Sequence, residues 1–141
     1  MTTPGHCNNS TTPTCDNSAE DNMGQGWSST SVTTGVTSAT DGATNTATLV
    51  SNYGAGVPAA KYCADMIYGG YDDWFLPAKD ELNLLWTYRS PIPGLSTTSS
   101  IYWSSSEFNT NYLWSQAFPE GTQSTSFAKG SVALVRCMRK F

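Results

Sequence analysis

Apolar positions follow two different spacings along the chain. Between residues 45 and 92 they recur at steps of three and four, which is the spacing of an amphipathic α-helix. From residue 101 onward they fall in short runs separated by Asn, Gly and Pro turns, which is typical of β-strands. Helices that come first and strands that follow predict an α+β fold with segregated elements.

Three helices are expected in the first part. The first runs from Thr46 to Asn52 with Asn45 as its N-cap, because an Asn side chain accepts a hydrogen bond from the first helical turn. The second runs from Pro58 to Tyr68, since proline at the first position of a helix loses no hydrogen bond. Its residues at three- and four-residue steps share one buried face: Ala59, Tyr62, Cys63 and Met66.

The third helix is expected to begin at Pro77 and to end before Pro91. Asp80 and Glu81 lie in its first turn, where the helix dipole favours acids. Its buried stripe consists of Leu82, Leu85 and Trp86.

Four strands are expected after the helices: Ile101–Trp103, Tyr112–Phe118, Ser124–Phe127 and Val132–Met138. Val132–Met138 is apolar on both faces, so it should lie in the centre of its sheet. We interpret residues 1–40 as a loop-rich N-terminal segment of the same domain, with Trp27 as its strong anchor and Ser31–Thr34 as a candidate strand. Residues 41–141 would form the core of the domain.

Four cysteines allow three disulfide pairings. Cys7 and Cys15 lie eight residues apart in a segment rich in Pro, Asn and Thr and suit a local loop, which leaves Cys63 for Cys137. The alternative is four reduced thiols, two of them buried. No cysteine spacing resembles a metal site and His6 is the only histidine, so a zinc centre is not expected. Disulfides would indicate an oxidising compartment.

The composition favours an extracellular protein. Only 13% of the residues are charged, about half of the usual share, and Ser, Thr, Asn and Gly take up the difference. A formal net charge of -4 argues against a dedicated nucleic-acid binder. No segment approaches the roughly 20 apolar residues of a membrane span, so no membrane insertion is expected. No signal peptide is visible, so a secreted form would be a piece of a longer chain.

Four bases gather near the end of the sequence. Lys129, Arg136, Arg139 and Lys140 fall in the last thirteen residues with no acid among them. Clustered guanidinium and ammonium groups bind sulfates through charge-assisted hydrogen bonds, so these four are candidate ligands of a polyanion. The alternative is that Arg136 is a structural strand residue paired with a carboxylate such as Glu107, while the others are merely solvated.

A second candidate binding surface lies in residues 107–116, which join two expected strands. Asn109, Asn111 and Tyr112 combine a rigid aromatic with flexible amides, the residue types of adaptable binding surfaces. The alternative is an Asn-rich hairpin with Trp114 in the core.

Two further clusters are given structural roles. The paired acids Asp72 and Asp73 have the oxygen ligands that calcium prefers, but we expect them to organise the loop around Trp74 instead. The serines of residues 104–106 lack a general base, because His6 lies far away at the N-terminus. We therefore expect no metal, no cofactor and no enzymatic activity.

Several motifs in a fixed order resemble one bacterial family, the C-terminal domain of the Legionella collagen-like adhesin, over about residues 40–141. The motifs are Ala59–Asp65 (AAKYCAD), Gly70–Leu85 (GYDDWFLPAKDELNLL), Tyr102–Glu107 (YWSSSE) and Val135–Phe141 (VRCMRKF). The resemblance implies a C-type-lectin-like fold, with two to three helices packed on a twisted antiparallel sheet. In that fold a disulfide commonly joins a helix to the last strand, as a bond from Cys63 to Cys137 would.

The resemblance also implies a role in binding. The adhesin carries this domain on a trimeric collagen-like stalk and binds sulfated polysaccharides of the host surface, and related domains serve as retroelement-diversified receptors for proteins. We therefore expect a secreted or surface-displayed domain that recognises carbohydrate, including sulfated glycosaminoglycan-like polysaccharide, as a homotrimer where such a stalk precedes it. A host surface protein is the alternative ligand.

A shorter likeness points to a third function. Phe75-Leu76-Pro77 followed by Glu81 is similar to a signature of formylglycine-generating enzymes, which share the implied fold. An oxidase of that kind uses redox-active or metal-bound thiols, so a buried bridge between Cys63 and Cys137 would remove it.

Overall fold

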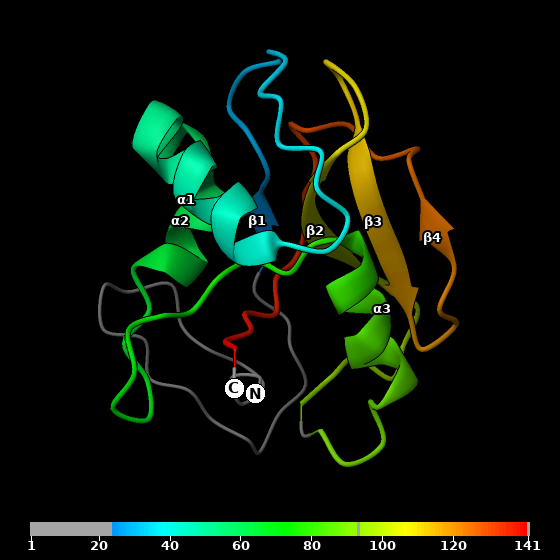
Figure 1. Cartoon of the computed structure of the whole chain (residues 1–141). Coiled ribbons are helices and arrows are strands. Elements are labelled where there is room, and N and C mark those ends of the chain that lie inside the picture. The colour runs from blue at the N-terminus through cyan, green and yellow to red at the C-terminus, as the bar shows by residue number, and fades with distance from the viewer. Residues whose placement is uncertain (1–23, 93, 141) are drawn as a thin grey trace.

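The computed structural model describes residues 24–92 and 94–140, which form an α+β fold of three α-helices and a five-stranded sheet (Figure 1). The helices are α1 (Gly42–Tyr53), α2 (Pro58–Ala64) and α3 (Lys79–Thr87), with a short 3-10 helix, η1 (Gly54–Gly56), between the first two. The strands are β1 (Gly24–Gly26), β2 (Ser100–Glu107), β3 (Leu113–Phe118), β4 (Gln123–Ser124) and β5 (Val132–Leu134). The predicted α+β class is therefore confirmed.

Helix α1 begins earlier than predicted. Its N-cap is Asp41, whose carboxylate accepts a hydrogen bond from the backbone N–H of Thr44 at 3.0 Å. Asn45, the predicted cap, lies inside the helix and is buried, and its side-chain amide donates to the backbone oxygen of Ser38. The prediction failed because both residues are good caps and only the tertiary contact of Asn45 separates them.

Helix α2 ends at Ala64 rather than at Tyr68. Gly69 and Gly70 have φ values of 64° and 82°, so the chain turns there, and the backbone N–H of Tyr68 bonds to the oxygen of Tyr71 instead of continuing a helix.

Helix α3 starts two positions after Pro77, and its first turn contains the predicted acids Asp80 and Glu81. The Glu81 carboxylate accepts from the backbone N–H groups of Ala78 and Gly42, which ties the starts of α3 and α1 together.

The sheet is mixed, which corrects the expectation of an antiparallel one. Its order is β1-β5-β2-β3-β4, and β5 pairs parallel with β2 while the other pairings are antiparallel. The last strand lies inside the sheet, as its two apolar faces predicted. It is shorter than expected, because beyond Leu134 the chain leaves the sheet and Met138 forms an isolated bridge with Phe75.

The strands on the other side of the sheet also differ in extent from the prediction. Strand β2 continues through the serines to Glu107, and β4 covers only Gln123–Ser124. Phe127, expected in the same strand as Ser124, packs its ring against the edge of Trp103 instead.

The core consists of two apolar clusters. One contains Leu49 of α1 and the buried residues of α2 together with Trp27 and Trp103, and the other joins Leu82 and Leu85 of α3 to Tyr102. Neighbouring residues of β2 enter different clusters because successive side chains of a strand point to opposite faces.

The predicted disulfide between Cys63 and Cys137 is present, and both residues are fully buried in the first cluster. It joins α2 to the segment after β5 across a sequence separation of 74 residues. Cys7 and Cys15 lie outside the described residues, so their predicted bond stays a prediction.

Candidate functional site

Three loops meet at one end of the molecule. They are residues 29–35, the tip of the β2–β3 hairpin at residues 108–112, and residues 125–131 between β4 and β5. Figure 1 shows all three in the upper part of the view, whereas the last described residues, in red, lie in the lower half. We call the exposed residues of these three loops the distal surface.

A buried ion pair fastens the loops together. The Nζ atom of Lys129 lies 2.6 Å from Oε2 of Glu107, and both side chains are almost completely buried. Lys129 also donates to the backbone oxygen of Val32 at 2.7 Å. The carboxylate of Glu107 accepts hydrogen bonds from the backbone and hydroxyl of Thr34 and from the backbone of Gly35. Residues 31–34, predicted as a candidate strand, instead form a loop, and Thr34 is the residue of this loop that contacts the carboxylate.

The environment keeps Glu107 charged. Burial raises the pKa of this carboxyl, but the hydrogen bonds from Lys129, Thr34 and Gly35 outweigh burial and hold the pKa below its ordinary value. A buried pair of this kind strongly destabilises a protein when one partner is removed, because the other charge stays behind without compensation. The pair therefore fixes the positions of the loops around it.

The loops also contact one another directly. The hydroxyls of Thr33 and Thr110 lie 2.6 Å apart, which joins the 29–35 loop to the hairpin tip. The backbone N–H of Lys129 donates to the oxygen of Asn111, which joins the hairpin tip to the third loop. Hydrogen bonds therefore join the three loops into one continuous distal surface.

The three predicted hairpin residues all lie on the distal surface. Asn109 shapes the turn, because its side-chain oxygen accepts from the backbone N–H groups of Asn111 and Tyr112, both at 2.9 Å. Asn111 and Tyr112 are exposed, and Tyr112 is 38% exposed. Trp114 is half-buried on the flank of the hairpin, between the predicted alternatives of contact surface and core.

Sequence reasoning missed several members of the distal surface. Phe108 is 51% exposed and meets the ring of Trp114 edge-on, with centroids 5.8 Å apart. Val32 and Thr33 belong to a loop that the sequence analysis left without a function. A signal was present: residues 28–40 contain no charged side chain, which is unusual for a segment without large apolar residues.

The four predicted bases do not form one surface cluster. Lys129 and Arg136 are each 1% exposed, so the structure corrects the expectation that these two side chains face a ligand in solution. Lys129 is buried because it neutralises Glu107. Glu107, the carboxylate suggested as a partner of Arg136, is thus held by Lys129.

The two bases that remain at the surface lie near carboxylates. Arg139 donates from Nε and Nη2 to the two oxygens of Asp73 at 2.7 and 2.9 Å, and its guanidinium lies 3.6 Å from the ring centroid of Tyr71. The hydrogen bond from Arg139 holds the pKa of the Asp73 carboxyl below its usual range. Lys140, with a side chain 64% exposed, lies 3.6 Å from Asp41.

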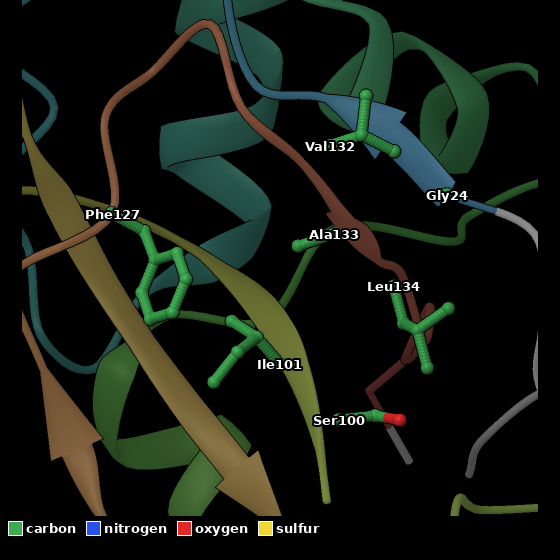
Figure 2. A pocket seen from close by; sticks show the side chains of 7 residues that line it. All are labelled: Gly24, Ser100, Ile101, Phe127, Val132, Ala133 and Leu134. Carbon is green, nitrogen blue, oxygen red and sulfur yellow. The ribbon is translucent and has the colours of Figure 1, made fainter.

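A shallow apolar pocket lies beside the third loop. It has a volume of about 340 Å³ and is lined by Gly24, Ser100, Ile101, Phe127, Val132, Ala133 and Leu134. Figure 2 shows Phe127 and Ile101 along one side and the side chains of β5 along the other. A side chain at Gly24 would collide with Val132, so glycine keeps β1 close to β5. The lining offers apolar contact and one hydroxyl, and no titratable group.

The serines of β2 take part in the internal hydrogen-bond network. The hydroxyl of Ser104 donates to the backbone oxygen of Trp114 at 2.6 Å, and that of Ser106 donates to Ser38 at 2.7 Å. The hydroxyl of Ser105 accepts from the amide of Asn45. These contacts give the serines the structural role that their sequence context indicated.

Two features are absent from residues 24–92 and 94–140. None of the helices there has the length and apolar character to cross a membrane. In the same residues, no three His, Cys, Asp or Glu side chains gather as a metal site would require.

Comparison with known proteins places the chain in a family. The family model described as the Lcl C-terminal domain matches residues 22–139, which is most of the chain. No curated protein matches it.

Proposed function

Because the chain belongs to the family of the Lcl C-terminal domain and is thus an adhesin-related domain, we propose that it recognises an extracellular carbohydrate through the distal surface. One observation carries the proposal: three loops are fixed by the buried pair of Lys129 and Glu107, and their exposed residues form a single surface. Adhesion requires such a surface to be arranged before the ligand arrives, since ordering loops on binding lowers affinity.

The side chains of the distal surface suit a sugar. A sugar ring carries hydroxyls on its rim and C–H bonds on its faces, so it needs donors and acceptors together with flat apolar groups. Thr, Ser and Asn supply donors and acceptors in all three loops, while Phe108 and Tyr112 supply exposed rings. Rigid aromatics and short polar side chains are also ordered at low entropic cost.

The proposal includes the finer fold and the setting. A C-type-lectin-like fold is supported by a disulfide that joins a helix to the segment after the last strand. A secreted or surface-displayed location is supported by the same bond, because disulfides persist in oxidising compartments. A homotrimer on a collagen-like stalk would multiply weak contacts of the distal surface into firm attachment.

Binding, rather than catalysis, is the role we assign. The hydroxyls of the serines in β2 are engaged in internal hydrogen bonds. Cys63 and Cys137, the thiols considered for an oxidase, are bonded to each other in the core.

A second candidate is a sulfated polysaccharide held by the end of the chain. It is favoured by the exposed side chain of Lys140, which follows Arg139 in the sequence and whose contact with Asp41 is long, at 3.6 Å. Binding through these bases should weaken steeply as ionic strength rises.

The experiment is a glycan array probed with five forms of the protein. These are the wild type, Phe108→Ala, Tyr112→Ala, the pair Arg139→Ala/Lys140→Ala, and Tyr88→Ala. Tyr88 is 66% exposed on the far end of α3, so it is a matched control for losing an exposed ring. We expect glycan hits that fall about tenfold or more in affinity with either distal variant and persist in the other two.

Other outcomes separate the candidates. Hits that depend on Arg139 and Lys140 and fade in salt would move the site to the end of the chain. Hits that no variant weakens would remove both sites. An array without hits would contradict carbohydrate as the ligand and leave the protein alternative.

A further inference from the structure

The distal surface carries no formal charge at neutral pH. Residues 28–40, 108–118 and 121–128 contain no Asp, Glu, Lys or Arg. Glu107 and Lys129, which hold the loops, are buried 2.6 Å apart and oppose each other's field. What the surface offers to a ligand is therefore hydroxyls, amides and aromatic rings.

Several bases at the surface of the protein lie beside acids of the same chain. The Nζ atom of Lys79, on the flank of the hairpin, lies over the ring of Trp114 at 4.8 Å from its centroid. Three bases at the surface each lie within hydrogen-bonding or ion-pair distance of a carboxylate: Lys79 with Asp80, Arg139 with Asp73 and Lys140 with Asp41.

A charged ligand would be penalised at the distal surface. A sulfate or carboxylate that leaves water needs a cation or several donors to replace its hydration, and an unpaired one costs far more than a neutral hydroxyl does. The chain as a whole has a net charge of -4, so it also repels an approaching polyanion. A neutral sugar meets neither penalty.

We infer that the distal surface selects uncharged carbohydrate and discriminates against the sulfated form of the same sugar. This inference rests on the proposed function and narrows it to one class of ligand. Discrimination of this kind needs no special contact with the neutral sugar. It arises because the surface has no cation to replace the hydration that the sulfate loses on binding.

The test uses matched pairs of neutral and sulfated polysaccharides. One pair is dextran and dextran sulfate, and the other is a neutral galactan and carrageenan, which is a sulfated galactan. The affinity of the protein for each of the four polysaccharides is measured. We expect the neutral member to bind at least about tenfold more tightly, with affinity changing less than about twofold between roughly 50 and 500 mM salt. Phe108→Ala and Tyr112→Ala should weaken the neutral member.

A gain of charge sharpens the test. Asn111→Lys places an ammonium on the distal surface, and Ser51→Lys places one on the exposed face of α1 as the matched control. Asn111→Lys should bring the sulfated member to within about threefold of the neutral one at low salt, and Ser51→Lys should leave the preference unchanged.

Each failure has a separate meaning. A wild type that binds the sulfated member more tightly overturns the inference, while the proposed function stands if Phe108→Ala or Tyr112→Ala weakens that binding. Equal response of the two lysine variants also overturns the inference, because the added charge would then act through the whole molecule. A protein that binds neither member of either pair overturns the inference, and the proposed function falls with it only if the glycan array also gives no hits.

Discussion

The two ends of the molecule keep irregular backbone in place by different means. At the distal end, loops without regular structure are held by a buried ion pair and by hydrogen bonds to one carboxylate. At the opposite end, the segment after β5 is held by the Cys63–Cys137 bond inside an apolar cluster. One end is thus fixed by charge and the other by a covalent bond and apolar packing.

This difference in how the two ends are held explains why the proposed ligand surface lies at the distal end. A loop held by apolar packing must bury apolar side chains and so loses them as contact groups. A loop held by a carboxylate uses only its backbone N–H groups and short hydroxyls, as Thr34 and Gly35 do, and its other side chains remain at the surface. The two ends should also respond to different treatments, reduction at one and acid at the other.

The largest effect is expected from removing the disulfide. Cys63→Ala/Cys137→Ala should lower the free energy of unfolding by about 4.5 kcal/mol in the chain-entropy model, given a closed loop of 74 residues. Urea unfolding followed by Trp fluorescence measures it. Ligand binding at the distal surface should be unchanged wherever the variant is still folded. Weakened binding by a folded variant would show that the two ends are coupled.

The next effect belongs to the ion pair. Lys129→Met should lower the free energy of unfolding by about 3–4 kcal/mol, because Glu107 is left buried and uncompensated. Ligand binding should be lost even in the folded fraction, since residues 29–35 lose their anchor. Lys61→Met removes an exposed pair with Asp65 and should change stability by less than about 0.5 kcal/mol.

A double variant separates the charge from the packing. Lys129→Met/Glu107→Gln removes the stranded charge and should recover part of the lost stability. If the single Lys129→Met variant were as stable as the wild type, the ion pair would not be what holds the distal end.

The two ends also differed in how far the sequence predicted them. Cys63 could be placed on the core face of a helix from local spacing, and four cysteines leave few pairings. The Cys63–Cys137 bond, which holds the segment after β5, could therefore be predicted. The pair of Lys129 and Glu107 is 22 residues apart, and Thr34 is 73 residues from the carboxylate it contacts. No local pattern encodes contacts over such distances.

The basic residues also show that sequence proximity does not predict contacts between distant segments. Lys129, Arg136 and Arg139 are close in sequence, so composition groups them into one site. In the structure Lys129 turns inward to Glu107 and Arg139 turns outward to Asp73. Charge clustering along a chain predicts a surface patch only where no acid from a distant segment reaches the bases.

The third expected effect is a fall in the stability of the folded protein at acidic pH. The pKa of Glu107 is lowered in the folded protein relative to 4.5, its ordinary value. The stability that this carboxylate contributes is therefore fully present above pH 4.5 and is lost as pH falls through the lower folded value. The matched comparison is Glu107→Gln, whose stability should fall less between pH 6 and pH 3 than that of the wild type. Asp41 and Asp73 also have lowered pKa values, but they act equally in both proteins. Parallel pH profiles would contradict the role of Glu107.

The smallest effect is expected at the ion pair of Arg139 and Asp73, whose carboxylate is exposed. Asp73→Asn removes the acceptor of the two hydrogen bonds from Arg139 at the covalent end. Stability should change too little to resolve by thermal unfolding, because solvent screens the pair. Binding of a neutral polysaccharide at the distal surface should not change either. Dextran sulfate, in contrast, should gain weak and salt-sensitive binding, because the negative charge of Asp73 beside Arg139 is then removed. If Asp73→Asn instead altered the binding of the neutral polysaccharide, the ligand surface would extend to the end of the chain. The two ends of the molecule would then not have separate roles, one fixed by an ion pair and used for binding and the other fixed by the disulfide.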